Sequence, residues 1–391
     1  MFQITQDVAV YGCFWAFGLV NNVLYVVILS AALDLVGAEA PKAIVLLADV
    51  VPALLCKITA PFYFHLVPYK YRIGLLIGLS FGGMMIIANS ESRFFRLLGI
   101  ALASASSGLG EVSFLQLTHY YTSWAMAGFS SGTGAAGLVG SFMFLVMTSW
   151  IGIATSTSLI VFSLLPFSFA VVYGMILPVG SDSAQYESLG EPETQSESTP
   201  DLKFRTFSFF GTVERIKPLV KPFMAPLMLV YIAEYIINQG ISPTLLFPLE
   251  DMPYTRYRDA YVTYGALYQL GVFISRSSSP FFRVRRLYLP AILQWANLIL
   301  CIIQSLFVLL PNIYLVMLVI FYEGLLGGLG YVNTFLLVSE TVPLSEREFA
   351  MGSVGISDST GIAIAALVSM WLEKALCGYQ VSTGRPWCNY E

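Results

Sequence analysis

Residues 112–181 have the sequence VSFLQLTHYYTSWAMAGFSSGTGAAGLVGSFMFLVMTSWIGIATSTSLIVFSLLPFSFAVVYGMILPVGS, in which no Asp, Glu, Lys or Arg occurs. A soluble domain covers its surface largely with charged side chains, whereas a charge at the middle of a bilayer costs about 2.5 to 3.5 kcal/mol on insertion scales. This run of 70 uncharged residues between Glu111 and Asp182 therefore predicts a polytopic membrane protein. The few charges inside the other apolar stretches mark the candidate functional positions.

The composition of the whole chain agrees with a membrane protein. The 391 residues are 57% hydrophobic and 11% charged, and the mean hydropathy is +0.73. An ordinary soluble domain is about 25% charged. No basic run occurs, so nucleic acid is not an expected partner. The five cysteines and two histidines form no metal-ligand motif, and we expect no metal, no cofactor and no catalytic site.

Gaps between charges, with Gly and Pro punctuation, predict an all-α fold of about eleven transmembrane helices. The first apolar segment lacks the basic start of a signal peptide, so we expect a retained helix. The expected spans lie near residues 8–33, 42–65, 73–89, 96–118, 124–148, 152–177, 219–241, 259–275, 287–310, 313–338 and 348–372.

A polar segment divides these spans into two groups. Residues 179–201 contain acidic, Ser and Thr residues but no Lys or Arg. Such a segment buries too little apolar surface to become ordered. We therefore expect an N-terminal six-helix bundle (1–178), a disordered acidic linker (179–217), a C-terminal bundle of about five helices (218–373) and a short tail (374–391). Two helical bundles joined by a long polar loop is the plan of major facilitator transporters.

The basic residues predict the orientation of the chain. Most of them lie in alternate loops, which the positive-inside rule places in the cytosol. The N-terminus and the linker are then cytosolic, and the tail is lumenal. Arg256 and Arg258 are the main exception, and Arg93 and Arg96 are a smaller one. The loops in question contain Lys70, Arg72, Lys203, Arg205, Arg215, Lys217, Lys221, Arg276, Arg283, Arg285, Arg286 and Arg347.

Several spans contain polar motifs that a membrane helix does not need for insertion. With their flanking residues they are Leu46 to Asp49, Ser104 to Phe114, Ser130 to Gly137, Glu234 to Gly240, Ser275 to Ser278, Tyr322 to Phe335, and Arg347 to Met351 with Ile356 to Asp358. In this order and spacing, over nearly the whole chain, they resemble the battenin family, and the short linker resembles its fungal members. The resemblance implies a major-facilitator-like protein of the lysosomal or vacuolar membrane. It also implies links to vacuolar pH, basic amino acids, glycerophosphodiester clearance and vesicle traffic.

Four acidic residues inside the spans are candidates for proton coupling: Asp49, Glu111, Glu234 and Glu323. Glu111 follows Ser and Gly residues, so the alternative for it is a hydrogen bond that holds two closely packed helices together. The alternative for Glu234 is an ion pair with a basic residue of a neighbouring helix. The Ser130 to Gly137 motif lacks the lysine of a phosphate-binding loop, and we expect it to serve helix packing.

The candidate substrate contacts are the other polar side chains of the spans. Lys57 suits an anionic group, and its alternative is to extend its charge towards the membrane surface. For the two adjacent asparagines of the first span, the alternative is a hydrogen bond between helices. The full set is Asn21, Asn22, Tyr25, Lys57, Glu234, Asn238, Gln239 and Asn333.

Three further features lie outside this set. Arg276 ends a span, and we expect it to cap that helix or to form a gate with Asp358. Tyr186 and Leu189 in the linker fit a tyrosine-based sorting signal read by adaptors. Cys388 stands fourth from the end, where a prenylated cysteine would, and the alternative is a disulfide between Cys377 and Cys388.

The expected function is transport of a small polar solute across the bilayer, coupled to protons and contributing to vacuolar pH. The solute is a glycerophosphodiester or a basic amino acid. The alternative is a membrane protein that transports nothing and regulates vesicle traffic or vacuolar pH through its cytosolic loops.

Overall fold

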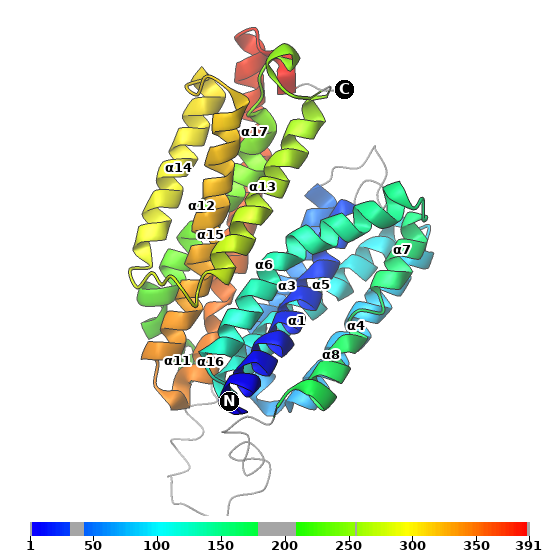
Figure 1. Ribbon diagram of the computed structural model, residues 1–391, viewed down its shortest axis with the longest axis vertical. Coiled ribbons are helices and arrows are strands. Elements are labelled where there is room, and N and C mark those ends of the chain that lie inside the picture. Colours follow the sequence, from blue (N-terminus) through cyan, green and yellow to red (C-terminus); the bar gives the residue numbers. More distant parts are fainter. Residues whose placement is uncertain (1, 32–42, 179–208, 255, 389–391) are drawn as a thin grey trace, which may run out of the picture. The chain divides into compact units, whose positions relative to one another are not determined.

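The computed structural model describes residues 2–31, 43–178, 209–254 and 256–388. All regular structure in these ranges is helical, which confirms the all-α fold (Figure 1). The chain forms two compact units. The first comprises residues 1–224 and 335–356, and the second comprises residues 225–334 and 357–391.

The first unit contains the helices of the N-terminal half. An interrupted helix, α7 and α8, with the π-helical turn η4 after it, forms the span expected at 152–177. Helix α11 begins at Phe209, so residues 209–217, which we expected in the disordered linker, are helical. Residues 179–208, with Tyr186 and Leu189, lie outside the described residues. The helices are α1 (Phe2–Ser30), α3 (Ala43–Tyr63), α4 (Tyr69–Asn89), α5 (Arg93–Leu117), α6 (Ser123–Leu145), α7 (Thr155–Phe162), α8 (Phe167–Val171), α11 (Phe209–Leu219) and α16 (Leu344–Val354).

The second unit contains most of the C-terminal half. Its helices are α12 (Ala225–Ile236), α13 (Tyr257–Ser277), α14 (Tyr288–Phe307), α15 (Ile313–Thr341) and α17 (Ile356–Ser382). Nine helical stretches in the described ranges are long and apolar enough to cross a membrane. Helices α3 and α13, of 21 residues each, contain two and three charged residues and are the two further helices at expected spans. Every expected span therefore falls on helical residues, but the span expected at 348–372 is divided between α16 and α17.

The closest helix packing in the first unit is between α1 and α6, and glycines permit it. A Cβ atom on Gly128 would overlap the carbonyl of Tyr11, and one on Gly132 would overlap the carbonyl of Trp15. Small residues let two helices approach backbone to backbone. The motif from Ser130 to Gly137 lies in this contact and all eight of its residues are buried, which confirms the expectation of close helix packing.

Helix α16 packs in the first unit, although its neighbours in sequence, α15 and α17, lie mostly in the second. Glu348 of α16 accepts hydrogen bonds from the hydroxyls of Tyr69 (2.7 Å) and Tyr120 (2.8 Å). Gly352 lies against the side-chain amide of Gln116, where a Cβ would be too close. These polar contacts attach a C-terminal segment of the chain to the N-terminal helices.

We expect Gly128→Leu to lower the free energy of unfolding by about 1–3 kcal/mol, because the added side chain overlaps the backbone of α1. Gly12→Leu is the matched control, since a Cβ at Gly12 meets no atom within 4 Å. Thermal unfolding of the purified protein in detergent measures both. Equal melting temperatures for the two variants would contradict the close approach of α1 and α6.

Candidate functional site

The first unit holds a buried ion pair between two helices. Lys57 Nζ of α3 lies 2.6 Å from Glu111 Oε2 of α5, and the two side chains are 4% and 13% exposed. The alternative that Lys57 extends to the membrane surface is therefore wrong. A charge withdrawn from water needs a partner, and Glu111 provides it. The pair is neutral as a whole.

Asp49 lies on α3, two turns before Lys57, and its side chain is buried. Its Oδ2 atom has no hydrogen-bond partner among the described residues. Ser104 of α5 donates a hydrogen bond to the backbone carbonyl of Asp49, which links the two helices without involving the carboxyl group. A buried carboxyl oxygen without a partner is costly, and such groups are candidates for binding a proton or a cation.

The asparagines of the first span have structural partners. Asn21 Nδ2 donates to the carbonyl of Ser107 (3.1 Å), and Ser107 Oγ donates to the carbonyl of Asn21 (3.2 Å). These two reciprocal hydrogen bonds link α1 to α5. For Asn21 they agree with the alternative role, a hydrogen bond between helices. Asn22 donates to Gly18 in its own helix (3.1 Å), and Tyr25 is half-buried. Substrate contact by these residues stays a prediction.

The second unit holds a cluster of two buried glutamates. Tyr268 of α13 donates a hydrogen bond to Glu234 Oε1 of α12, and Asn238 donates to Glu323 Oε1 of α15 (2.9 Å). The second carboxyl oxygen of each glutamate, Oε2, is buried and has no hydrogen-bond partner in the described part of the chain. Gly327 makes room for this arrangement, because a Cβ there would collide with the Glu234 carboxyl group.

A half-buried arginine, Arg276, lies near Glu234. Arg276, in the last turn of α13, donates from Nη2 to the hydroxyl of Tyr231 (2.9 Å), and its guanidinium stacks 4.1 Å from the ring centre of Tyr331. Asp358, in the first turn of α17, accepts hydrogen bonds from the backbone N–H and hydroxyl of Ser359. A gate formed by Arg276 and Asp358 stays a prediction.

The two remaining candidates differ in their surroundings. Gln239 is half-buried in the π-helical turn η6 (Ile237–Ile241), which also contains Asn238. Such turns are frequent at functional sites. Asn333 of α15 accepts a hydrogen bond from the backbone N–H of Val284 (2.8 Å) and donates to Leu329 (2.9 Å). Asn333 therefore holds the loop between α13 and α14.

Sequence reasoning missed the tyrosines of this cluster. Tyr268 binds Glu234 directly, and Tyr264 donates to the carbonyl of Leu245 (2.7 Å). A signal for them was present, because the tyrosines of α13 recur at spacings of four, three and four and so share one helix face. They are Tyr257, Tyr261, Tyr264 and Tyr268.

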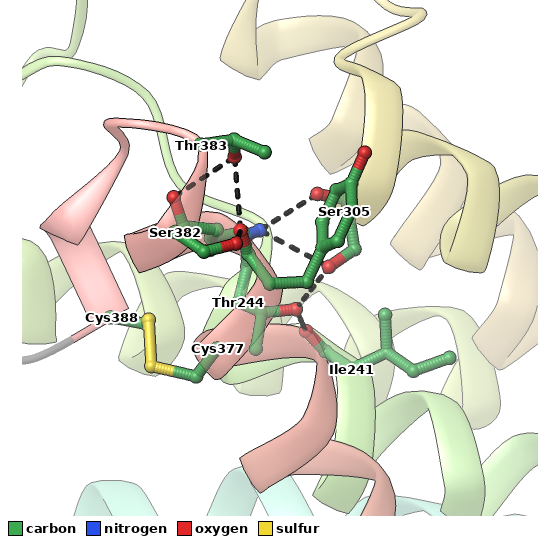
Figure 2. Close-up of a disulfide and its surroundings, with 9 residues drawn as sticks. Ile241, Thr244, Ser305, Cys377, Ser382, Thr383 and Cys388 are labelled. Carbon is green, nitrogen blue, oxygen red and sulfur yellow. Dashed lines mark hydrogen bonds between the residues drawn. A yellow bond between two sulfur atoms is a disulfide. The ribbon is translucent and has the colours of Figure 1, made fainter.

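The C-terminal tail is closed by a disulfide. Cys377 near the end of α17 is bonded to Cys388, with Cα atoms 5.7 Å apart (Figure 2). Gln380 donates to the carbonyls of Thr244 (2.9 Å) and Ser305 (2.8 Å), and Arg385 donates to Leu306 (2.5 Å). The carbonyls of Ser305 and Leu306 lie in the last turn of α14, where they have no partner within that helix, and these donors satisfy them. Cys388 was expected to be either prenylated or bonded to Cys377, and in the structure it forms the disulfide.

The fold is that of a major facilitator transporter. The human organic anion transporter MFSD10 (TETRAN) superposes with a TM-score of 0.63 at 13% identity, covering 97% of each chain. The outward conformation of FucP, a major facilitator superfamily transporter, superposes with a TM-score of 0.55 at 14% identity, covering 97% of this chain and 96% of that one. At these identities the likeness shows the fold alone.

Sequence comparison then gives the family. The model of the CLN3 protein family matches residues 12–379, and the chain belongs to this family. Protein BTN1 of Yarrowia lipolytica is 57% identical over 394 residues, with all of both chains covered. Protein BTN1 of Debaryomyces hansenii is 49% identical, with 98% of each chain covered. The resemblance to the battenin family is confirmed, and the chain is a multi-pass membrane protein with a transporter-like fold.

Lys57→Met should destabilise the first unit by about 3–5 kcal/mol, because it leaves the Glu111 carboxylate buried without its partner. The double variant Lys57→Met/Glu111→Gln should recover most of this loss, since neither charge remains. Thermal unfolding in detergent tests the comparison. A double variant less stable than Lys57→Met would contradict a direct pairing of the two charges.

Proposed function

We propose that this chain moves a small polar solute across the vacuolar or lysosomal membrane, coupled to protons, and so contributes to vacuolar pH. The observation that carries the proposal is the pair of buried glutamates in the second unit, Glu234 and Glu323. Each has one oxygen bound by a neighbour and one oxygen without a hydrogen-bond partner among the described residues. A purely structural carboxyl group would be expected to have both oxygens satisfied.

The balance of buried charge favours a basic solute. In the first unit the basic side chains Lys57 and Arg72 equal the acidic side chains Asp49 and Glu111 in number, so the charges of this group balance. In the second unit Glu234, Glu323 and Asp358 are buried, whereas Arg276 is the basic side chain near Glu234. An excess of carboxyl groups suits protons and cations, so we place a basic amino acid ahead of a glycerophosphodiester. The phosphodiester would instead use Lys57 or Arg276.

The proposed coupling uses the difference in proton concentration between the two sides. A carboxyl group open to the acidic lumen takes up a proton, and the same group open to the neutral cytosol releases it. Rocking of helical halves, as in major facilitator transporters, would alternate the two exposures. Asp49, Glu111, Glu234 and Glu323 are the proposed proton carriers, with Glu111 acting through its pairing with Lys57.

The proposed orientation places the N-terminus and the linker in the cytosol and the C-terminal tail in the lumen. Disulfides persist in oxidising compartments and are rare in the cytosol, so the bond between Cys377 and Cys388 supports a lumenal tail. The tail lies at the end of α14, beside Leu306. The 20 residues of α14 rise about 30 Å, the thickness of the hydrocarbon core, so the start of α14 faces the cytosol. The sorting signal at Tyr186 and Leu189 would then be accessible to adaptors.

Glu234→Gln and Glu323→Gln should each abolish proton-driven movement of labelled arginine in vesicles that contain the purified protein, because an amide cannot carry the proton. Glu346→Gln is the control, since that carboxylate is half exposed and pairs with Arg215 at 2.8 Å. Parallel assays with a labelled glycerophosphodiester show which of the two candidate solutes the protein transports. Unchanged transport of both solutes in the Glu234 and Glu323 variants would overturn the proposed role of these residues.

The regulatory alternative predicts a different pattern. If the chain acts only through its cytosolic segments, deletion of residues 182–201 should abolish the control of vacuolar pH in cells, and Glu234→Gln should not. A transporter gives the opposite result, with the deletion tolerated and the glutamine variant inactive.

The orientation predicts how the tail cysteines react. In sealed vacuoles, Cys377 and Cys388 should resist a membrane-impermeant maleimide and should react only after solubilisation and reduction. An engineered cysteine in the linker, Ser188→Cys, should react from outside without either treatment. Labelling of Cys388 in sealed, unreduced vacuoles would contradict both the bond and the lumenal tail.

A further inference from the structure

The loop between α13 and α14 exposes aromatic and basic side chains next to one another. Residues 278–286 have the sequence SSPFFRVRR. Phe281 is 93% exposed and Phe282 is 56% exposed. The arginines that follow, at positions 283, 285 and 286, are exposed as well. No transport step proposed above uses any of these side chains.

The backbone of this loop is held in place. The backbone N–H groups of Phe281 (2.9 Å) and Phe282 (2.8 Å) both donate to the carbonyl of Ser278. The N–H of Val284 donates to the side chain of Asn333 on α15 (2.8 Å). Asn333 is itself oriented by its bond to Leu329 in the preceding turn. The phenyl rings and guanidinium groups are therefore carried on an ordered backbone.

Two of the loop's arginines lack an acidic partner among the residues that the structure describes. No Asp or Glu occurs between Asp259 and Glu323. Arg285 and Arg286 form no ion pair with any described residue. Arginine binds phosphate oxygens through several N–H groups in one plane, and a cluster of arginines beside a membrane attracts anionic lipids. The complementary partner is therefore polyanionic and rich in phosphate.

The position of the loop identifies the source of that phosphate. The loop joins the end of α13 to the start of α14, so it lies where two spans leave the bilayer, away from the C-terminal tail (Figure 1). Exposed phenyl rings at that level enter the boundary between headgroups and acyl chains. A soluble phosphate compound would offer nothing for Phe281 and Phe282 to contact.

We propose that residues 278–286 form a binding site for the headgroup of an anionic phospholipid, with the arginines on its phosphates and the phenyl rings among its acyl chains. On the orientation proposed above, the lipid belongs to the cytosolic leaflet. The site is separate from the buried glutamates, so lipid binding and transport are tested independently.

The test uses the full-length protein in nanodiscs of phosphatidylcholine mixed with phosphatidylinositol bisphosphate. Native mass spectrometry measures how strongly the anionic lipid is enriched on the protein. Arg285→Gln/Arg286→Gln should weaken binding by about fivefold for each arginine removed. Arg285→Lys/Arg286→Lys should retain most of it, because the positive charge remains. Unchanged enrichment in the glutamine variant would overturn the proposal.

Three further measurements make the assignment specific. Arg256→Gln, at the other end of α13, is the matched control and should leave enrichment unchanged; an equal loss there would overturn the assignment to this loop. Phe281→Ser/Phe282→Ser should lower enrichment although every arginine is present. Soluble inositol trisphosphate should compete poorly, and competition as strong as that of the lipid would overturn the membrane lipid as the partner.

Discussion

The structure depends on one constraint: a polar group inside a membrane span must find its partner within the protein, because lipid offers none. The ion pair of Lys57 and Glu111 meets this constraint in the first unit. The reciprocal bonds of Asn21 and Ser107 meet it between α1 and α5. The carboxyl groups of Glu234 and Glu323 meet it only in part, and this difference separates a structural polar contact from a candidate functional one.

Small residues make these polar contacts geometrically possible. Gly327 leaves room for the Glu234 carboxyl group, and Gly110 leaves room for the side chain of Asn21. The missing side chains of Gly128 and Gly132 likewise allow α1 and α6 to approach each other closely. In this chain glycine therefore has two functions, close approach of helices and space for a buried polar side chain. The motifs that identified the family contain glycines with each of these two functions.

The two ends of the second unit differ in chemistry. At one end, a disulfide cross-links the tail, and Gln380 and Arg385 donate hydrogen bonds that attach it to the end of α14. At the other end, an ordered loop exposes Phe281, Phe282, Arg285 and Arg286, and the two arginines form no ion pair with a described residue. A cross-linked, internally bonded end suits an oxidising lumen, and a basic, aromatic end suits an anionic membrane surface. The orientation proposed from the basic loops and the chemistry of the two ends agree.

The sequence by itself determined that the chain is an all-helical membrane protein, where its spans lie and to which family it belongs, because the absence of charge and the order of motifs are local properties. It also identified the buried acids. Only the tertiary structure decided that Lys57 pairs with Glu111, that Tyr268 binds Glu234, that Asn333 holds a loop, and that α16 packs with the N-terminal helices. These contacts join residues far apart in the chain, and helix periodicity cannot specify which faces of different helices meet.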